Sequence, residues 1–175
     1  MMTPLPAPLG TSALFGWRVD RAAHAANWNS GSGAEIDGGR WNSAGTKAVY
    51  LSVDPGTAIL EVAAHKRFSI LDTLPHVLTA VQVHDPAEVH VVQPSEVPNR
   101  NWLVPGPPSQ GQMAFGDALL AHHAFVLLPS VVSSHSWNLV VSPALAAGRY
   151  TLVLQEPLAI DTRLHPPAAA GRAVR

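Results

Sequence analysis

Two adjacent glycines precede an arginine and a tryptophan in the segment Gly38-Gly39-Arg40-Trp41-Asn42. Glycine allows a backbone to approach a ligand closely, a guanidinium binds phosphate through two parallel hydrogen bonds, and an indole offers a flat face for stacking. The segment therefore predicts a site for an anion attached to a ring. Taken alone, it is also compatible with a tight turn that leaves Arg40 on the surface and Trp41 in the core.

Glu61 is a second candidate, because its neighbours three and four positions away are mostly small. These neighbours are Thr57, Ala58, Ala64 and His65. Residues at these spacings share one face of a helix, so the face that carries Glu61 can approach another element closely. A carboxylate on such a face is a candidate site residue. The alternative is an exposed Glu61 that pairs weakly with His65.

Ser130 lies in the segment Leu128-Pro129-Ser130-Val131-Val132, near the end of an apolar strand, and Asn138 follows a few residues later. A serine hydroxyl can bind a carboxylate or a ribose, although a turn serine is the commoner explanation of the local pattern. No Gly-x-Ser-x-Gly sequence surrounds Ser130, which argues against a serine hydrolase. The sequence does not decide which of Ser130, Ser133 and Ser134 belongs to a site.

The chain has nine histidines and no cysteine. Without cysteine it has no disulfide, no thiolate metal site and no thiol nucleophile, which favours a reducing compartment. His122 and His123 point to different faces of a helix, and no His-Glu-x-x-His motif occurs. Spacing places no third ligand beside Glu61 and His65. We therefore expect no metal site.

The charge of the chain is low and balanced. Its 175 residues include 12 acidic and 11 basic side chains, for a net charge of −1. Charged residues make up 13%, about half of the usual ~25%. This balance argues against binding of nucleic acid or of an anionic membrane surface.

No segment has the pattern of a membrane span or a signal peptide. The longest apolar stretch, 124–132, contains Pro129 and is far shorter than the roughly 20 residues that cross a bilayer. Residues 1–10 lack the basic and apolar regions of a signal peptide. We expect a cytoplasmic protein whose tails, 1–12 and 166–175, flank a single domain at 13–165.

Apolar alternation and turn residues predict the elements that position these side chains. Helices are expected after Asp20 as an N-cap, from Asp54-Pro55 to about Arg67, and over 112–123, with a loop over 27–39. Strands are expected over 13–19, 46–53, 76–84, 88–92, 124–132, 137–141 and 150–155.

The pattern favours an α+β fold, in which short helices accompany a compact mixed sheet. Strands outnumber helices, and most connections are too short for repeated crossover helices. Residues 88–92 could pair with 76–84. Within 46–53, Tyr50 and Ser52 lie on the face opposite Val49 and Leu51. We therefore expect Tyr50 to line a cleft instead of the core.

Taken together, these segments resemble the RES domain family, which is named for an arginine, a glutamate and a serine and is found as toxins of bacterial toxin–antitoxin pairs. Leu128 and Ser142 depart from the family pattern, which often has valine and asparagine there; the second change leaves the role of that position open. The resemblance rests on Trp17-Arg18-Val19, 38–42, 48–52, 58–62, 128–132 and Asn138 before Ser142-Pro143, in this order.

The resemblance implies an ADP-ribosyltransferase-like fold that binds NAD as substrate and breaks its nicotinamide–ribose bond. Carried over by position, Arg40, Tyr50 and Glu61 form the central group, Ser130 is the family serine and Arg18 is a second arginine. Members either destroy NAD, by hydrolysis or phosphorolysis, or transfer ADP-ribose to a protein. The implied partner is an Xre-type helix-turn-helix antitoxin, and the toxin is expected to form a homodimer.

The chemistry of the residues agrees with a NAD site. A pyrophosphate suits Arg40 and Arg18, and a nicotinamide ring suits Tyr50 or Trp41, with Asn138 as a further binding residue. Nicotinamide leaves as a neutral molecule, so one carboxylate, Glu61, suffices to stabilise an oxocarbenium-like ribose.

Three functions stay open at this point. They are NAD degradation, ADP-ribosylation of a specific protein, and a catalytically silent module whose surface binds a partner chain. A surface with so little charge suits burial against other chains.

Overall fold

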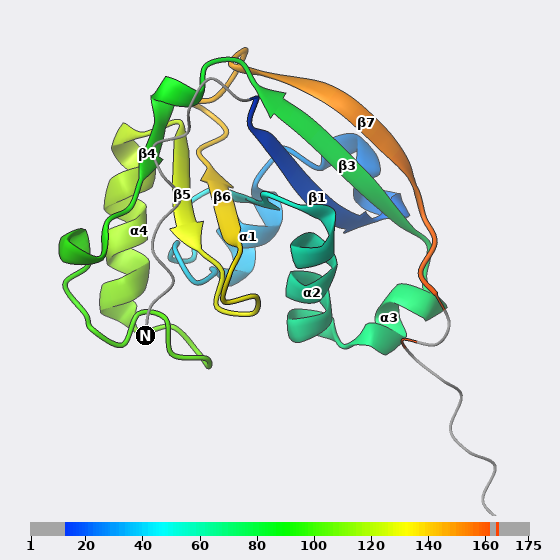
Figure 1. Cartoon of the computed structure of the whole chain (residues 1–175), viewed down its shortest axis with the longest axis horizontal. Coiled ribbons are helices and arrows are strands. Elements are labelled where there is room, and N and C mark those ends of the chain that lie inside the picture. The colour runs from blue at the N-terminus through cyan, green and yellow to red at the C-terminus, as the bar shows by residue number, and fades with distance from the viewer. Residues whose placement is uncertain (1–12, 162–163, 165–175) are drawn as a thin grey trace, which may run out of the picture.

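A seven-stranded sheet in the order β4-β5-β6-β2-β1-β3-β7 forms the centre of the molecule (Figure 1). The computed structural model describes residues 13–161 and 164, so the expected tails 1–12 and 166–175 lie outside the described residues. Neighbouring strands are antiparallel except β4 and β5, which are parallel. The strands are β1 Phe15–Arg21, β2 Val49–Ser52, β3 His76–Val83, β4 Val89–Val91, β5 Phe125–Pro129, β6 Trp137–Val141 and β7 Tyr150–Leu158.

The helices are short and lie beside the sheet (Figure 1). Helix α2 packs against β1 and β2, and α4 packs against β5. The α-helices are α1 Ser32–Asp37, α2 Pro55–Lys66, α3 Phe68–Thr73 and α4 Gln110–His122, and 3₁₀ turns occupy Ala22–Asn27, Pro86–Glu88 and Pro94–Glu96. The predicted α+β class, with a mixed sheet and short helices, is confirmed.

Helix α2 begins as its sequence predicts. The Asp54 side chain accepts a hydrogen bond of 2.8 Å from the backbone N–H of Thr57, and Pro55 occupies the first turn. An aspartate cap followed by proline satisfies a free N–H group and fixes the helical φ angle. The helix ends at Lys66, where Arg67 turns the chain with a φ of 68°.

Two predictions for the N-terminal third were wrong. Asp20 does not cap a helix, because it lies within β1 and its carboxylate pairs with Arg18 at 2.7 Å. The segment 27–39 is not a loop throughout, because it contains α1. Gly31 and Gly38 flank that helix, each with a φ of 71°, a conformation that glycine adopts without a steric penalty.

The predicted pairing of 88–92 with 76–84 was also wrong. Strand β4 pairs in parallel with β5, with Val89 opposite Phe125. The two neighbours of β3 in the sheet are β1 and β7. A parallel pair needs a long connection that usually contains a helix, and α4 lies in the connection between β4 and β5. Helix α3, which follows α2 directly, was not predicted.

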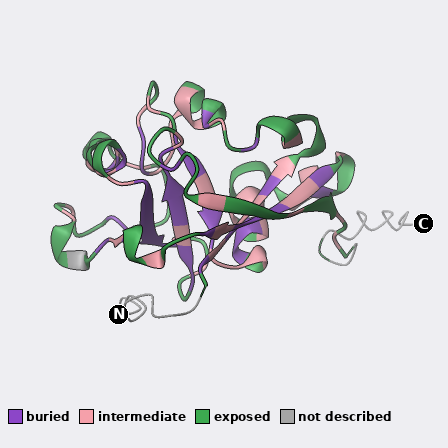
Figure 2. Cartoon of the chain, turned by 90° about the horizontal axis from the view of Figure 1, so that it is seen from above, coloured by how far each residue is buried: buried purple, intermediate pink, exposed green. Residues whose placement is uncertain are grey.

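Side-chain alternation divides the core between the two faces of the sheet. Val49, Leu51 and Leu139 lie in the core of one face, with Trp28. Trp41, Trp102, Val126 and Val140 lie in the core of the other face, with Leu120 of α4. Figure 2 shows the buried residues gathered along the central strands.

Candidate active site

Glu61 lies in α2 with its carboxylate directed at β6 and at the residue that follows β5. Its Oε1 atom accepts hydrogen bonds from Ser130 Oγ at 2.8 Å and from Asn138 Nδ2 at 2.6 Å. Asn138 Oδ1 in turn accepts a bond of 2.9 Å from Ser52 Oγ. We call these four residues the Glu61 network. The structure thus joins Glu61, Ser130 and Asn138, which the sequence offered as separate candidates, and Glu61 is not left to pair with His65.

The register of the sheet explains why these side chains meet. Asn138 lies opposite Ser52 of β2 on one side and Leu128 of β5 on the other. Directly opposite residues point to the same face of a sheet, so Ser52 and Asn138 lie on the face that α2 covers. Ser52 was missed as a site residue, although the predicted alternation already placed it on the face of Tyr50.

Ser130 is the serine whose hydroxyl reaches Glu61. Its Oγ atom also accepts the backbone N–H groups of Val132 at 3.1 Å and Ser133 at 2.9 Å, so its single hydroxyl proton is available for the carboxylate. Its backbone N–H donates to Ser136 O at 2.9 Å and closes the loop between β5 and β6.

Both donors bind the same oxygen of Glu61. Among residues 13–161 and 164, Glu61 Oε2 has no hydrogen-bond donor, and Glu61 and Asn138 both keep part of their surface exposed. The two hydrogen bonds to Oε1 therefore orient the carboxylate and leave Oε2 able to interact with a ligand. A preorganised anion of this kind can stabilise positive charge that develops on a bound substrate.

A second polar cluster shapes the turn at Gly38–Asn42, and we call Gly39, Trp41, Asn42 and Tyr50 the Asn42 network. The Tyr50 hydroxyl donates to Asn42 Oδ1 at 2.7 Å and accepts from Trp41 N at 3.0 Å. A Cβ atom on Gly39 would lie 2.6 Å from that hydroxyl, so the position requires glycine. Asn42 is fully buried, and its amide donates to the carbonyl oxygens of Ala34, Ser43 and Thr46.

The expectation that Trp41 stacks on a substrate ring was wrong. Trp41 is 2% exposed, and its indole packs edge-on against Trp102 and Phe115. Helix α4 comes close enough to cover it because Gly116 faces the Trp41 backbone, where a Cβ atom would lie 2.0 Å from the carbonyl oxygen. Trp41 is a core residue.

The side chain of Tyr50 lies on the other face of β2 from Val49 and Leu51, as predicted. Its hydroxyl is hydrogen-bonded to Asn42 and Trp41 of the turn. Burial raises the pKa of Tyr50 well above its usual value, and the Asp117 carboxylate adds to the rise, while the Trp41 N–H and the Arg40 charge oppose it. The hydroxyl therefore stays protonated at physiological pH and acts as a donor, not as a base.

Arg40 lies within electrostatic range of Glu61. Burial lowers the pKa of Arg40, while the charge of Glu61 acts in the opposite direction. Its Nη2 atom donates to Gly106 O at 2.7 Å. The structure thus places Arg40, Tyr50 and Glu61 in one region, where a guanidinium can bind a phosphate.

Arg18 lies elsewhere. Trp17 is paired with Ser52 and shares its face, and successive residues of a strand point to opposite faces, so Arg18 lies on the face away from Glu61. Its guanidinium pairs with Asp20 at 2.7 Å and donates to Tyr50 O at 2.9 Å. Arg18 therefore links β1 to β2, and the structure does not bring it into the Glu61 network.

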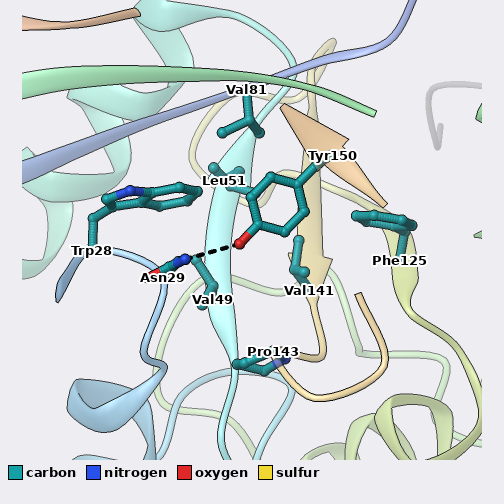
Figure 3. A pocket seen from close by; sticks show the side chains of 9 residues that line it. All are labelled: Trp28, Asn29, Val49, Leu51, Val81, Phe125, Val141, Pro143 and Tyr150. Atoms are coloured by element: carbon teal, nitrogen blue, oxygen red, sulfur yellow. Dashed lines mark hydrogen bonds between the residues drawn. The ribbon is translucent and has the colours of Figure 1, made fainter. Parts of the chain in front are cut away.

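An apolar cavity lies on the face away from Glu61, behind Val49 and Leu51 (Figure 3). Asn29 Nδ2 donates to the Tyr150 hydroxyl at 3.0 Å beside it. Its volume of about 10 Å³ holds about one water molecule, which is far too little for a nicotinamide ring. The lining residues are Trp28, Asn29, Val49, Leu51, Val81, Phe125, Val141, Pro143 and Tyr150.

A second hollow, of about 290 Å³, lies between α4 and the start of β2 and is lined by Lys47, Asp117 and Ser142, among others. Neither hollow is lined by Glu61. Across residues 13–161 and 164, no group of three or more histidine, aspartate or glutamate side chains could hold a metal ion. In the same part of the chain, no helix has the length and apolar character that a membrane span requires.

The sequence of residues 16–161 matches the family model of the RES domain. The chain belongs to the RES domain family. It is 33% identical over 134 residues to the "Prs ADP-ribosylating toxin" of Sphingobium sp. (strain YBL2), a match that covers 73% of this chain and 81% of that protein. It is 32% identical over 151 residues to a "Toxin Res" of Yersinia enterocolitica, covering 83% of this chain and 95% of the other.

A solved structure shares the fold of this RES domain. The M. tuberculosis MbcT-MbcA toxin–antitoxin complex contains a chain with a TM-score of 0.66 and 22% identity, and the match covers 84% of this chain and 85% of that one. The match to the RES domain and the identity to the two named relatives confirm the family predicted from the arginine, glutamate and serine motifs.

Proposed function

We propose that this RES domain is the toxin of a toxin–antitoxin pair and that it breaks the nicotinamide–ribose bond of NAD, which depletes NAD and arrests growth. The observation that carries the proposal is the hydrogen bonding of the Glu61 carboxylate. One oxygen is held by Ser130 and Asn138, and the other has no donor among residues 13–161 and 164. The names of the relatives support the toxin role.

The proposed reaction needs one carboxylate and no general acid. When the bond between the nicotinamide nitrogen and ribose C1′ breaks, its electron pair stays on the nitrogen and neutralises the pyridinium. Positive charge then develops on the ribose, where Glu61 Oε2 would stabilise it. Water or phosphate attacks the same carbon and loses a proton, which gives ADP-ribose or ADP-ribose phosphorylated at that carbon.

Arg40 would bind the pyrophosphate of NAD. Arg40 belongs to the turn that the hydrogen bond between Asn42 and Tyr50 stabilises, so we assign Tyr50 a role in positioning Arg40. The partly exposed ring of Tyr50 would lie beside the nicotinamide. Trp41 and Arg18 are left out of the proposed site, because the first is buried and the second lies on the other face of the sheet.

Release of nicotinamide from NAD tests the proposal. We expect the purified protein to release it, in buffer with or without phosphate, and Glu61→Gln to lower kcat by about a hundredfold or more while the melting temperature stays close to that of wild type. Glu35→Gln is the matched control, because Glu35 is a partly exposed partner of Lys47 at 3.8 Å and does not belong to the Glu61 network. If wild type releases no nicotinamide in either buffer, the proposal is wrong.

Transfer of ADP-ribose to a protein is the second candidate, because one relative is named an ADP-ribosylating toxin. The same oxocarbenium-like ribose would then be attacked by a protein side chain. Labelled NAD added to a cell lysate separates the two reactions, since only transfer labels a protein band. We expect Glu61→Gln to remove such a band, whereas a silent interaction module would bind its partner without consuming NAD.

We also propose that this RES domain acts in the cytoplasm as a homodimer and binds an Xre-type helix-turn-helix antitoxin encoded beside it. The similar structure is a toxin–antitoxin complex, and the low charge of the chain suits burial against other chains. Light scattering of the toxin alone and with the product of the neighbouring reading frame tests both parts. A toxin that stays monomeric, or that does not bind that product, would contradict them.

A further inference from the structure

Two carboxylates of one helix contact the two ends of one loop. Asp54 and Glu61 are seven residues apart, which is about two turns of α2. Glu61 accepts a hydrogen bond from Ser130, the first residue of the 130–136 loop, and Asp54 accepts one of 2.6 Å from Ser136 Oγ, at its last residue. The backbone bond from Ser130 N to Ser136 O joins the two ends.

The two oxygens of Asp54 have different partners. Oδ1 accepts the Thr57 N–H and caps the helix, while Oδ2 accepts the hydroxyls of Thr57 at 2.7 Å and Ser136 at 2.6 Å. The cap and the contact with the loop are therefore separable by substitution. Burial alone would raise the pKa of Asp54, but hydrogen bonds from Ser136 and Thr57 outweigh it and lower the pKa, so the carboxylate is ionised at physiological pH.

We propose that Asp54 is a positioning residue for the reaction: through Ser136 it holds the loop so that Ser130 Oγ keeps Glu61 Oε1 in place. Without this contact, the Ser136 end of the loop loses its hydrogen bond to the N-terminus of α2. The Ser130 hydroxyl, whose position depends on the N–H groups of Val132 and Ser133, would then hold Glu61 less firmly. The activity readout of this inference rests on the proposed function of Glu61.

Two substitutions break the contact from opposite sides. Asp54→Ser keeps an N-cap, since serine caps about as well as aspartate, but its side chain is too short to reach Ser136. Ser136→Ala removes the donor and leaves the cap intact. Thr57→Val is the matched control, because it removes the other hydroxyl that binds the same oxygen and does not touch the loop.

We expect Asp54→Ser and Ser136→Ala to lower kcat for nicotinamide release by about tenfold, the effect of losing one hydrogen bond to a charged group, with KM within about twofold of wild type. The double variant should be no slower than the slower single variant, because both changes remove one interaction. Thr57→Val should stay within about twofold of wild type. Unchanged kcat in Ser136→Ala would overturn the inference even if Asp54→Ser fails to fold.

Amide hydrogen exchange gives a readout that does not depend on NAD. The N–H groups of Val132 and Ser133 bond to Ser130 Oγ, so they should exchange faster in Asp54→Ser and Ser136→Ala than in wild type, and at the wild-type rate in Thr57→Val. Equal exchange in all four proteins would overturn the inference. If wild type releases no nicotinamide, the proposed function fails, and the exchange rates still test the role of Asp54.

Discussion

Two asparagine-centred networks lie on one face of the sheet and differ in what they leave unused. In the Asn42 network, the asparagine is fully buried and its amide donates to three carbonyl groups and accepts the Tyr50 hydroxyl. In the Glu61 network, Asn138 is partly exposed and its donor ends on a carboxylate with one oxygen open. In the Asn42 network every hydrogen bond of the asparagine is made within the chain. In the Glu61 network the charged partner of the asparagine keeps one oxygen without a donor among residues 13–161 and 164, which is what the proposed function requires.

The two networks meet on β2. Tyr50 belongs to the first and Ser52 to the second, and residues two apart in a strand lie on the same face about 7 Å apart. A single strand therefore sets the distance between the turn that carries Arg40 and the carboxylate of Glu61. Substitutions in the two networks should have opposite signatures, with stability lost in one and activity lost in the other.

The largest effect is expected for Asn42→Ala. The change removes the acceptor of the Tyr50 hydroxyl proton and the buried amide that donates to three carbonyl groups, so the free energy of unfolding should fall by about 3 kcal/mol or more. Urea denaturation measures it. Asn29→Ala, at an exposed asparagine that bonds Tyr150, is the control and should change stability by about 0.5 kcal/mol or less. Equal losses of stability in the two variants would show that the buried Asn42 network stabilises the fold no more than the exposed hydrogen bond of Asn29 does.

The next effect is expected for Asn138→Ala, and it should appear mainly in the reaction. Glu61 would lose one of two donors, so kcat for nicotinamide release should fall by about tenfold to a hundredfold. The free energy of unfolding should fall by only about 1 kcal/mol, because Asn138 is partly exposed. A stability loss as large as that of Asn42→Ala, with kcat unchanged, would show that both networks are structural.

Alkaline pH should weaken the Asn42 network. The pKa of Tyr50 is higher in the folded protein than in the unfolded chain, so its contribution is fully present below the ordinary tyrosine value near 10 and is lost as pH rises above it. Each pH unit in that window costs up to about 1.4 kcal/mol. Urea denaturation of wild type and Tyr50→Phe from pH 9 to 11 should show a decline in wild type that the variant largely lacks.

Acid should weaken the contact between Asp54 and Ser136, which lies next to the Glu61 network, and this effect should be the smallest of the four. The pKa of Asp54 is lower in the folded protein, so its contribution is present above the ordinary aspartate value of about 4 and is lost as pH falls through the folded value. Denaturation of wild type and Asp54→Asn should therefore differ at pH 6 and converge below about pH 4. A constant difference across this range would contradict the assignment.

Several features were predictable because their causes are local. The cap at Asp54 and the proline after it mark the start of α2 in any sequence context, and alternation in 46–53 placed Tyr50 and Ser52 on one face. Glu61, Ser130 and Asn138 were found as separate candidates for the same reason. Each was suggested by residues within a few positions along the chain.

Three of the errors share a different cause. Trp41 is in the core because Gly116, far along the chain, lets α4 cover it. Arg18 had to point away from Trp17, but only the pairing of Trp17 with Ser52 shows which face that is. Residues 88–92 pair with β5 because α4 returns the chain in parallel. In each case the missing information was a contact between distant segments.

The amino-acid order was therefore enough to establish the α+β class and the family, and to propose the chemical types of the site residues. It could not show that Ser130 and Asn138 bind one oxygen of Glu61 and leave the other open. Those bonds join residues 69 and 77 positions apart, and their geometry depends on sheet register and on the docking of α2. Capping and alternation are decided within a few residues, whereas the direction of a carboxylate is decided by the packing that surrounds it.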